Sequence, residues 1–82
     1  MRLTALHSLA LMGANAKPAI PALAVAVSDP DPRVRRAAVL ALGAIGPAAK
    51  SVAATLRLAL KDQDPEVRKA AGAVLLTLER EP

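Results

Sequence analysis

The sequence of 82 residues contains no cysteine and no phenylalanine, tyrosine or tryptophan. Without cysteine the chain can form no disulfide, no thiolate metal site and no thiol nucleophile. Without aromatic rings it has nothing to stack on a nucleobase, a sugar or a flavin. Its one histidine, His7, has no acidic or basic residue spaced to orient it for catalysis. We therefore expect no catalytic, metal or cofactor-binding residue, and a protein that is not an enzyme.

Long apolar runs are also missing. None approaches the ~20 residues that cross a bilayer. The first 16 residues resemble a short signal peptide, but Thr4, His7 and Ser8 interrupt the apolar region. We therefore expect a cytoplasmic protein that does not enter a membrane.

The residues that are present favour one small folded domain. Hydrophobic residues make up 54% of the chain, mostly as alanine, leucine and valine. Eleven lysines and arginines against seven aspartates and glutamates give a net charge of +4. This charge is compatible with an acidic partner but does not require one.

An internal repeat organises the chain, because a shift of 33 residues superposes the sequence on itself without a gap. The identical pairs include Arg2 and Arg35, Leu9 and Leu42, Gly13 and Gly46, and Asp29 and Asp62. A period of this length is typical of stacked supersecondary units, none of which can bury its apolar face alone.

Each unit reads as two helices. Apolar residues recur at helical spacing between residues 33 and 45, where Asp31 is placed as the N-cap and Pro32 as the first helical residue. Gly46 followed by Pro47 ends that helix. The Asp64-Pro65 pair opens a second helix in the same way. The expected helices are 1–13, 18–28, 33–45, 48–61 and 66–78.

The string DPDPRVRRAAVLALGAIG (29–46), echoed by DQDPEVRKAAGAVLLTL (62–78), resembles the HEAT repeat, in particular the bacterial HEAT-like type also found in phycobilin lyases. The resemblance implies an all-α fold, an α-solenoid of antiparallel helix pairs with about five helices. It implies a single domain over 1–82. Its parts are an orphan inner helix (1–13), two full repeats (14–46 and 47–79) and a polar C-terminal end (80–82).

The resemblance also implies a structural ladder. Asp29 and Asp62 stand six residues before Arg35 and Arg68, as do the Asp and Arg of the family's ladder along the turns between helices. A carboxylate paired with a guanidinium fork is a strong structural bond. We expect Asp29 to supply the carboxylate of Arg35, and Asp62 that of Arg68.

HEAT arrays are scaffolds that bind other proteins on a concave face, so the resemblance implies a non-enzymatic protein-interaction module. We expect the concave face to present a set of small apolar and basic residues that suits an acidic amphipathic segment: Leu3, His7, Arg36, Leu40, Lys69, Ala73 and Leu76. One alternative is a weak, sequence-independent binder of nucleic-acid phosphates. Another is a fragment or subunit of a bilin-lyase-like HEAT protein.

The two ends of the array differ. The C-terminal end carries a polar candidate cap, Glu79 to Pro82, whereas the N-terminal helix has apolar residues and no acidic one. An uncovered apolar face generally marks an interface. We expect self-association through Leu6, Leu9 and Met12, most simply as a two-fold homodimer. The competing interpretation is a piece of a longer array.

Overall fold

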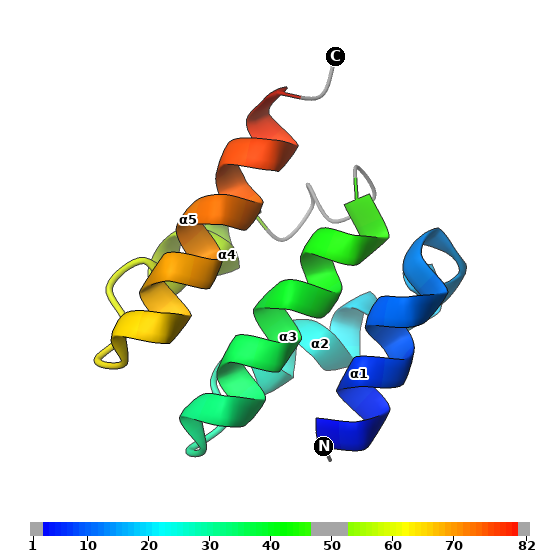
Figure 1. The fold of residues 1–82 in the computed structure, drawn as a ribbon, viewed down its shortest axis with the longest axis horizontal. Helices are drawn as coiled ribbons and strands as arrows, with labels where there is room; N and C mark the ends of the chain where they lie inside the picture. The colour runs from blue at the N-terminus through cyan, green and yellow to red at the C-terminus, as the bar shows by residue number, and fades with distance from the viewer. Residues whose placement is uncertain (1–2, 47–52, 81–82) are drawn as a thin grey trace.

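The computed structural model describes residues 3–46 and 53–80, and over these residues the chain is all-α, as predicted (Figure 1). In order along the chain, the elements are α1 (Leu3–Met12), the 3-10 helix η1 (Gly13–Ala19), α2 (Ile20–Ala26), α3 (Pro32–Ile45), α4 (Ala53–Ala59) and α5 (Pro65–Arg80).

The helices form two layers. The inner helices α1, α3 and α5 lie side by side and run in the same direction, while the outer helices α2 and α4 lie behind them (Figure 1). Each outer helix carries the chain back to the start of the next inner helix. The predicted α-solenoid of helix pairs is therefore confirmed.

The inner helices α3 and α5 begin within one residue of their predicted starts, and α3 ends at Ile45 as predicted, whereas α5 continues past 78 to Arg80 and takes in the start of the predicted polar end. Asp31 has extended backbone angles (φ −85°, ψ 119°), and its carboxylate accepts a hydrogen bond of 2.8 Å from the N–H of Arg33. The carboxylate of Asp64 accepts hydrogen bonds from the first turn of α5 in the same manner. Gly46 ends α3 with a φ of +81°, a conformation that glycine adopts without strain.

The outer helices are shorter than predicted. Instead of one helix over 18–28, the chain forms η1 and then α2, which ends at Ala26. Pro18 and Pro21 lie in this stretch, and a proline has no N–H with which to continue helical hydrogen bonding. The expected helix 48–61 is described only as α4, because 47–52 lie outside the described residues.

Side chains from both layers form one apolar core. Its largest fully buried members are Leu6, Leu23, Val39, Leu42, Ile45, Leu56 and Val67. No polar side chain is buried in the described part of the chain. The inner helices approach closely at Gly43 of α3, where an added Cβ would lie 2.7 Å from a methyl group of Val74 in α5.

The burial of Leu6 corrects one prediction. Leu6 was expected on an uncovered face, but it is fully buried, and Leu9 packs against the core as well. Leu6 is the counterpart of Val39 under the 33-residue shift, and both side chains belong to the buried core. Of the three predicted self-association residues, only Met12 is substantially exposed, at 49%.

Candidate partner-binding face

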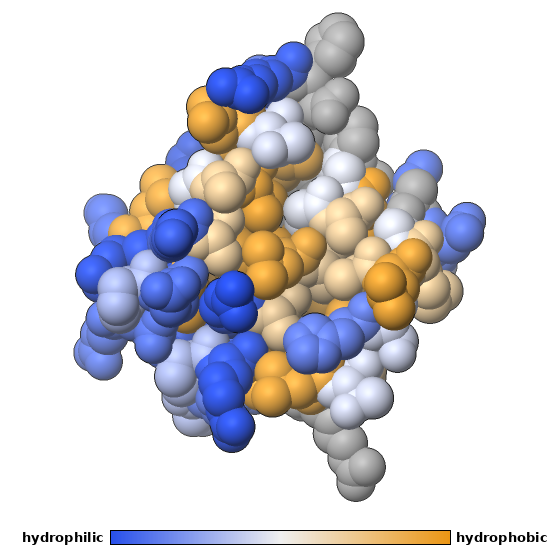
Figure 2. Space-filling view, in the orientation of Figure 1, coloured by the Kyte–Doolittle hydropathy of each residue, from blue (hydrophilic) through white to orange (hydrophobic). Residues whose placement is uncertain are grey.

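The exposed side chains of α1, α3 and α5 form a continuous surface, which we call the inner-helix face. Figure 2 views the molecule from this side and shows apolar residues gathered over the centre, with hydrophilic residues around the margin. An exposed apolar centre with a polar rim is the usual composition of a protein-binding surface.

The first feature of this face is an open hollow of about 200 Å³ between α1 and α3. Four predicted residues line it, namely Leu3 and His7 from α1 and Arg36 and Leu40 from α3. The hollow also includes Arg33 and Ala37, which the sequence analysis did not select. Each of the two stands three residues before a selected residue of α3, Arg33 before Arg36 and Ala37 before Leu40, and this helical spacing was the available signal.

A second hollow, of about 180 Å³, lies between α3 and α5. It is lined by Leu40, Gly43, Ala73, Val74 and Thr77. Leu40 and Ala73 were predicted for the face. Leu40 lines both hollows and is 41% exposed, so its side chain is the ridge between them.

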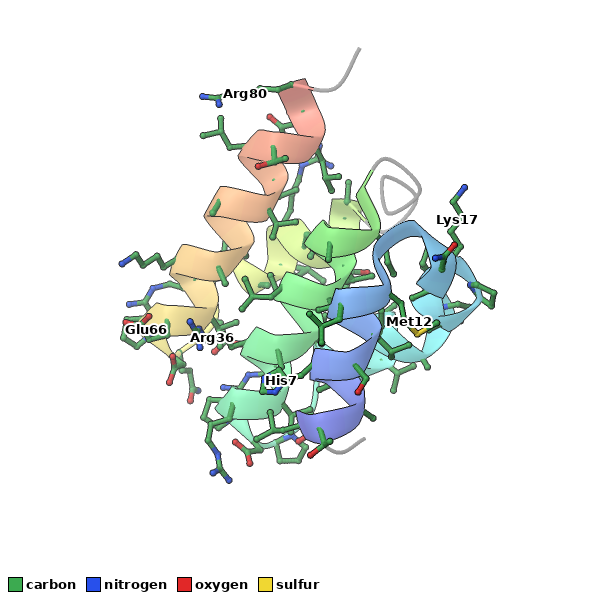
Figure 3. All side chains as sticks on the ribbon, turned by 45° about the vertical axis from the view of Figure 1, so that its right-hand side comes forward. His7, Met12, Lys17, Arg36, Glu66 and Arg80 are labelled. Atoms are coloured by element: carbon green, nitrogen blue, oxygen red, sulfur yellow. The ribbon has the colours of Figure 1, made fainter. Side chains whose placement is uncertain are left out.

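The charged residues of the face gather at the N-terminal ends of α3 and α5. Figure 3 shows Arg36 and Glu66 at this end of the molecule and His7 between α1 and α3. Arg33 forms an exposed ion pair of 2.9 Å with Asp31. Among the described residues, Arg36 and Lys69 have no carboxylate within 4 Å. These two cations are therefore free to meet a carboxylate of another molecule.

Two predicted residues stand apart from the hollows. Lys69 and Leu76 are exposed on α5, Leu76 by 54%, but neither lines a hollow of this face. They lie on the side of α5 away from α3, where no further inner helix of the described chain covers them. The structure thus brings together five of the seven residues predicted for the face.

The ladder forms with a different pairing from the predicted one. Arg35 binds the carboxylate of Asp62 in the next repeat, with hydrogen bonds of 2.8 Å from Nε and 3.0 Å from a terminal nitrogen. The Asp29 carboxylate instead accepts the N–H of Asp31 at 2.8 Å. Arg68 donates to main-chain carbonyls and not to the Asp62 carboxylate.

The local geometry explains why the predicted pairing fails. One terminal nitrogen of Arg35 donates to the carbonyl oxygens of Asp29 and Pro30, at 2.8 and 3.0 Å. These two bonds hold the Arg35 guanidinium against the turn before α3, so the other edge of the guanidinium points to the next repeat. The ladder therefore joins residues 27 apart. The sequence contains the same separation between Arg2, which lies outside the described residues, and Asp29.

The ion pairs shift the acidity of two aspartates. Hydrogen bonds from Arg35 hold the pKa of Asp62 below its usual range, against the opposing effect of burial, and the N–H of Asp64 adds to the lowering. Hydrogen bonds from the Arg33 side chain and N–H lower the pKa of Asp31. Both aspartates are thus held as carboxylates by the neighbouring arginines.

A hollow of about 540 Å³ lies elsewhere, along α2 and the turn that follows it. Its lining is Ala22, Val25, Ala26, Ser28, Asp29 and Pro30, none of which was predicted for partner binding. One short helix and its turn form this hollow, whereas three inner helices hold the smaller hollows of the inner-helix face in fixed relation. We therefore place the candidate site on the inner-helix face.

The described part of the chain has no group of three His, Asp or Glu side chains that could hold a metal ion. None of its helices is long and apolar enough to cross a membrane.

Comparison with known proteins agrees with the repeat geometry. A family model described as HEAT repeats matches residues 1–76. Neither the comparison with curated proteins nor that with solved structures finds a match. The matched region covers most of the sequence, with all of the first predicted repeat and most of the second, so this chain belongs to the HEAT repeat family.

Proposed function

We propose that this chain is a cytoplasmic, non-enzymatic interaction module that binds a segment of another protein on its inner-helix face. HEAT repeats generally serve as protein-interaction scaffolds. The observation that carries the proposal is Leu40, an exposed leucine that lines two hollows built from three helices. An apolar side chain of a partner on each side of Leu40 would fill both hollows.

The charges near Leu40 define the rest of the partner. Arg36 lines the first hollow and Lys69 lies on the neighbouring helix, and both are unpaired among the described residues. A carboxylate next to the partner's apolar residues would pair with Arg36. Glu66, on the first turn of α5, adds one acidic group at the same end of the face (Figure 3). The proposed ligand is therefore an amphipathic segment that places a carboxylate beside its apolar residues.

The binding should be rapid to form and of modest strength. The inner helices are already in place, so the protein loses little conformational entropy on binding. A standard interface buries about 800 Å² of surface on each partner. The chain exposes only 4865 Å² in total, so its inner-helix face offers a small contact area. We expect a dissociation constant in the micromolar range, about −8 kcal/mol.

A matched pair of triple variants tests the proposal. The first carries Arg36→Glu, Leu40→Ser and Lys69→Glu on the inner-helix face. The control carries the same three kinds of change on α4 and the turn after it, at the exposed residues Arg57, Leu58 and Lys61. We expect both variants to keep the helical circular dichroism, and only the first to lose the proteins that the wild-type chain captures from a lysate.

Equal capture by the two variants would contradict the proposed face. Retention of the wild-type chain on heparin at physiological salt would instead support the nucleic-acid alternative, since binding to phosphates is steeply salt-dependent. The bilin-lyase alternative requires binding of a tetrapyrrole, which absorbance titration would detect.

A further inference from the structure

One side of α5 exposes residues whose counterparts in α3 are covered. In α3, Arg35 is bound by Asp62, Val39 is fully buried, and Val74 approaches Gly43. Under the 33-residue shift the α5 counterparts are Arg68, Gly72 and Leu76. We call these three, with Glu79 one turn further along, the α5 stripe. Arg68, Leu76 and Glu79 are exposed, and Gly72 is half-buried beside Leu60, in the turn after α4.

No close approach of another helix requires a glycine at position 72 within the described residues. A Cβ at Gly72 would meet only a methyl group of Leu60, at an ordinary contact distance of 3.7 Å. A glycine in the interior of a helix destabilises it relative to alanine. At Gly43 the approach of Val74 explains the glycine, whereas at Gly72 nothing within the described residues does. Gly72 therefore presents no side chain beside Leu76, which is 54% exposed.

Arg68 is held in position for a carboxylate that the described chain does not supply. One terminal nitrogen of Arg68 donates to the carbonyl oxygens of Asp62 and Gln63, at 2.7 and 3.1 Å. Arg35 makes the equivalent two bonds, and its other edge then binds a carboxylate. The corresponding edge of Arg68 has no acidic partner among the described residues. A guanidinium already fixed in this way loses little freedom when a carboxylate binds.

The α5 stripe is complementary to itself. The point midway between Arg68 and Glu79 along α5 nearly coincides with the point midway between Gly72 and Leu76. Both points lie close to Ala73 and Val74. When a second α5 is laid antiparallel across this point, Leu76 of each copy lies over Gly72 of the other. The same placement brings Glu79 of each copy beside Arg68 of the other. One two-fold axis therefore satisfies both contacts twice.

We infer that a second copy of this chain covers the α5 stripe, in a two-fold dimer with α5 packed antiparallel on α5. The Leu76 side chain of each copy packs over Gly72 of the other, where no side chain obstructs it, and Glu79 completes the binding of Arg68. Glu79 is available for this contact because its pair with Arg57 is long, at 3.8 Å, with both side chains 60% exposed. Such surface pairs are weak. The interface is one helix wide, so the dimer dissociates readily.

Sedimentation equilibrium of the full chain over a concentration series tests this inference. We expect the wild type to dimerise with a dissociation constant of tens of micromolar, which corresponds to about −6 kcal/mol. Leu76→Glu should raise this constant at least ~10-fold. Leu11→Glu is the matched control, because Leu11 is 90% exposed on α1 and lies outside the α5 stripe. It should leave the constant unchanged.

A charge exchange tests the pairing of Arg68 with Glu79. The single variants Arg68→Glu and Glu79→Arg place like charges opposite each other, so each should weaken the dimer ~10-fold. The double variant restores opposite charges and should recover most of the wild-type affinity. These residues are exposed, and circular dichroism of each variant checks that the fold is kept.

Three results would overturn the inference. A wild type that stays monomeric throughout the series would exclude the dimer. A dimer lost with Leu11→Glu but kept with Leu76→Glu would place the contact on α1, as first predicted from the sequence. A double variant no better than the single ones would refute the pairing of Arg68 with Glu79.

Discussion

Arg35 in α3 holds the carboxylate of Asp62, which lies in the turn before α5, by two hydrogen bonds of 2.8 and 3.0 Å. The two side chains are only 17% and 11% exposed, so water screens their attraction little. Asp62 also accepts the N–H of Asp64, which lies just before α5. This one carboxylate therefore ties the start of the second inner helix to the preceding repeat.

The first prediction concerns removal of this carboxylate. Asp62→Ala leaves the Arg35 guanidinium without its carboxylate and removes the bond to the Asp64 N–H. Charge-assisted hydrogen bonds contribute about 1.5–3 kcal/mol, so we expect a loss of that size in the free energy of unfolding. Equilibrium urea denaturation followed by circular dichroism measures it.

Asp29→Ala is the matched control for that measurement. The carboxylate of Asp29 accepts only the N–H of Asp31 within the described residues, and Arg35 uses the main-chain oxygen of Asp29, which the variant keeps. We expect a loss of about 1 kcal/mol, as for a capping bond. If Asp29→Ala proved the more damaging change, the pairing within one turn would be correct and the pairing between repeats wrong.

The second prediction is the pH dependence of this bond. Arg35 lowers the pKa of Asp62 in the folded chain, whereas in the unfolded chain the pKa returns to about 3.8. The stabilisation is therefore complete above the unfolded pKa and is lost as the pH falls below about 4. The difference in unfolding free energy between the wild type and Asp62→Asn should be largest near neutral pH and shrink toward pH 2. A constant difference over this range would contradict the role of the charge.

Local signals made the inner helices predictable. The ends of α3 are marked by Asp31, Pro32 and Gly46, each of which acts within one turn of the end where it stands. The types and order of these residues therefore suffice to place the ends of the helix. The outer helices were less predictable because the prolines at 18 and 21 conflict with a regular helix, and packing decides which residues stay helical.

The candidate site was predictable to the extent that helical periodicity determines it. Under the 33-residue shift, Leu3 and His7 of α1 are the counterparts of Arg36 and Leu40 of α3. The four residues therefore lie on equivalent sides of their helices, and they line one hollow. The partner of Arg35 was not predictable from spacing alone, since aspartates stand both six residues before it and 27 residues after it. The carbonyl contacts of Arg35 decide between them, and these require the folded turn.

The third prediction compares two glycines in inner helices. Gly43→Ala would place a Cβ 2.7 Å from a methyl group of Val74, a β-branched side chain that moves little. We expect this overpacking to lower the unfolding free energy by about 1–2 kcal/mol. Gly72→Ala meets no such obstacle and should raise it by up to ~1 kcal/mol.

Urea denaturation at low protein concentration measures both changes in the monomer. The two variants make the same chemical change in the interiors of two neighbouring inner helices, so helix propensity alone predicts equal gains. A stabilising Gly43→Ala would therefore mean that α3 and α5 lie further apart than in this structure.

The last prediction contrasts two leucines of the same helix. Leu6 is fully buried beside α3, whereas Leu11 is 90% exposed. Leu6→Ala should lower the free energy of unfolding by about 2–5 kcal/mol, because it removes buried methyl groups and leaves a cavity. Leu11→Ala should change it by less than about 0.5 kcal/mol, as expected of surface sites. Thermal denaturation compares the two. Since a domain of this size has little stability in reserve, Leu6→Ala should also unfold part of the population at 37 °C. A small effect of Leu6→Ala would show that α1 is not packed on α3 in solution, and that the N-terminal helix offers its apolar side to another molecule.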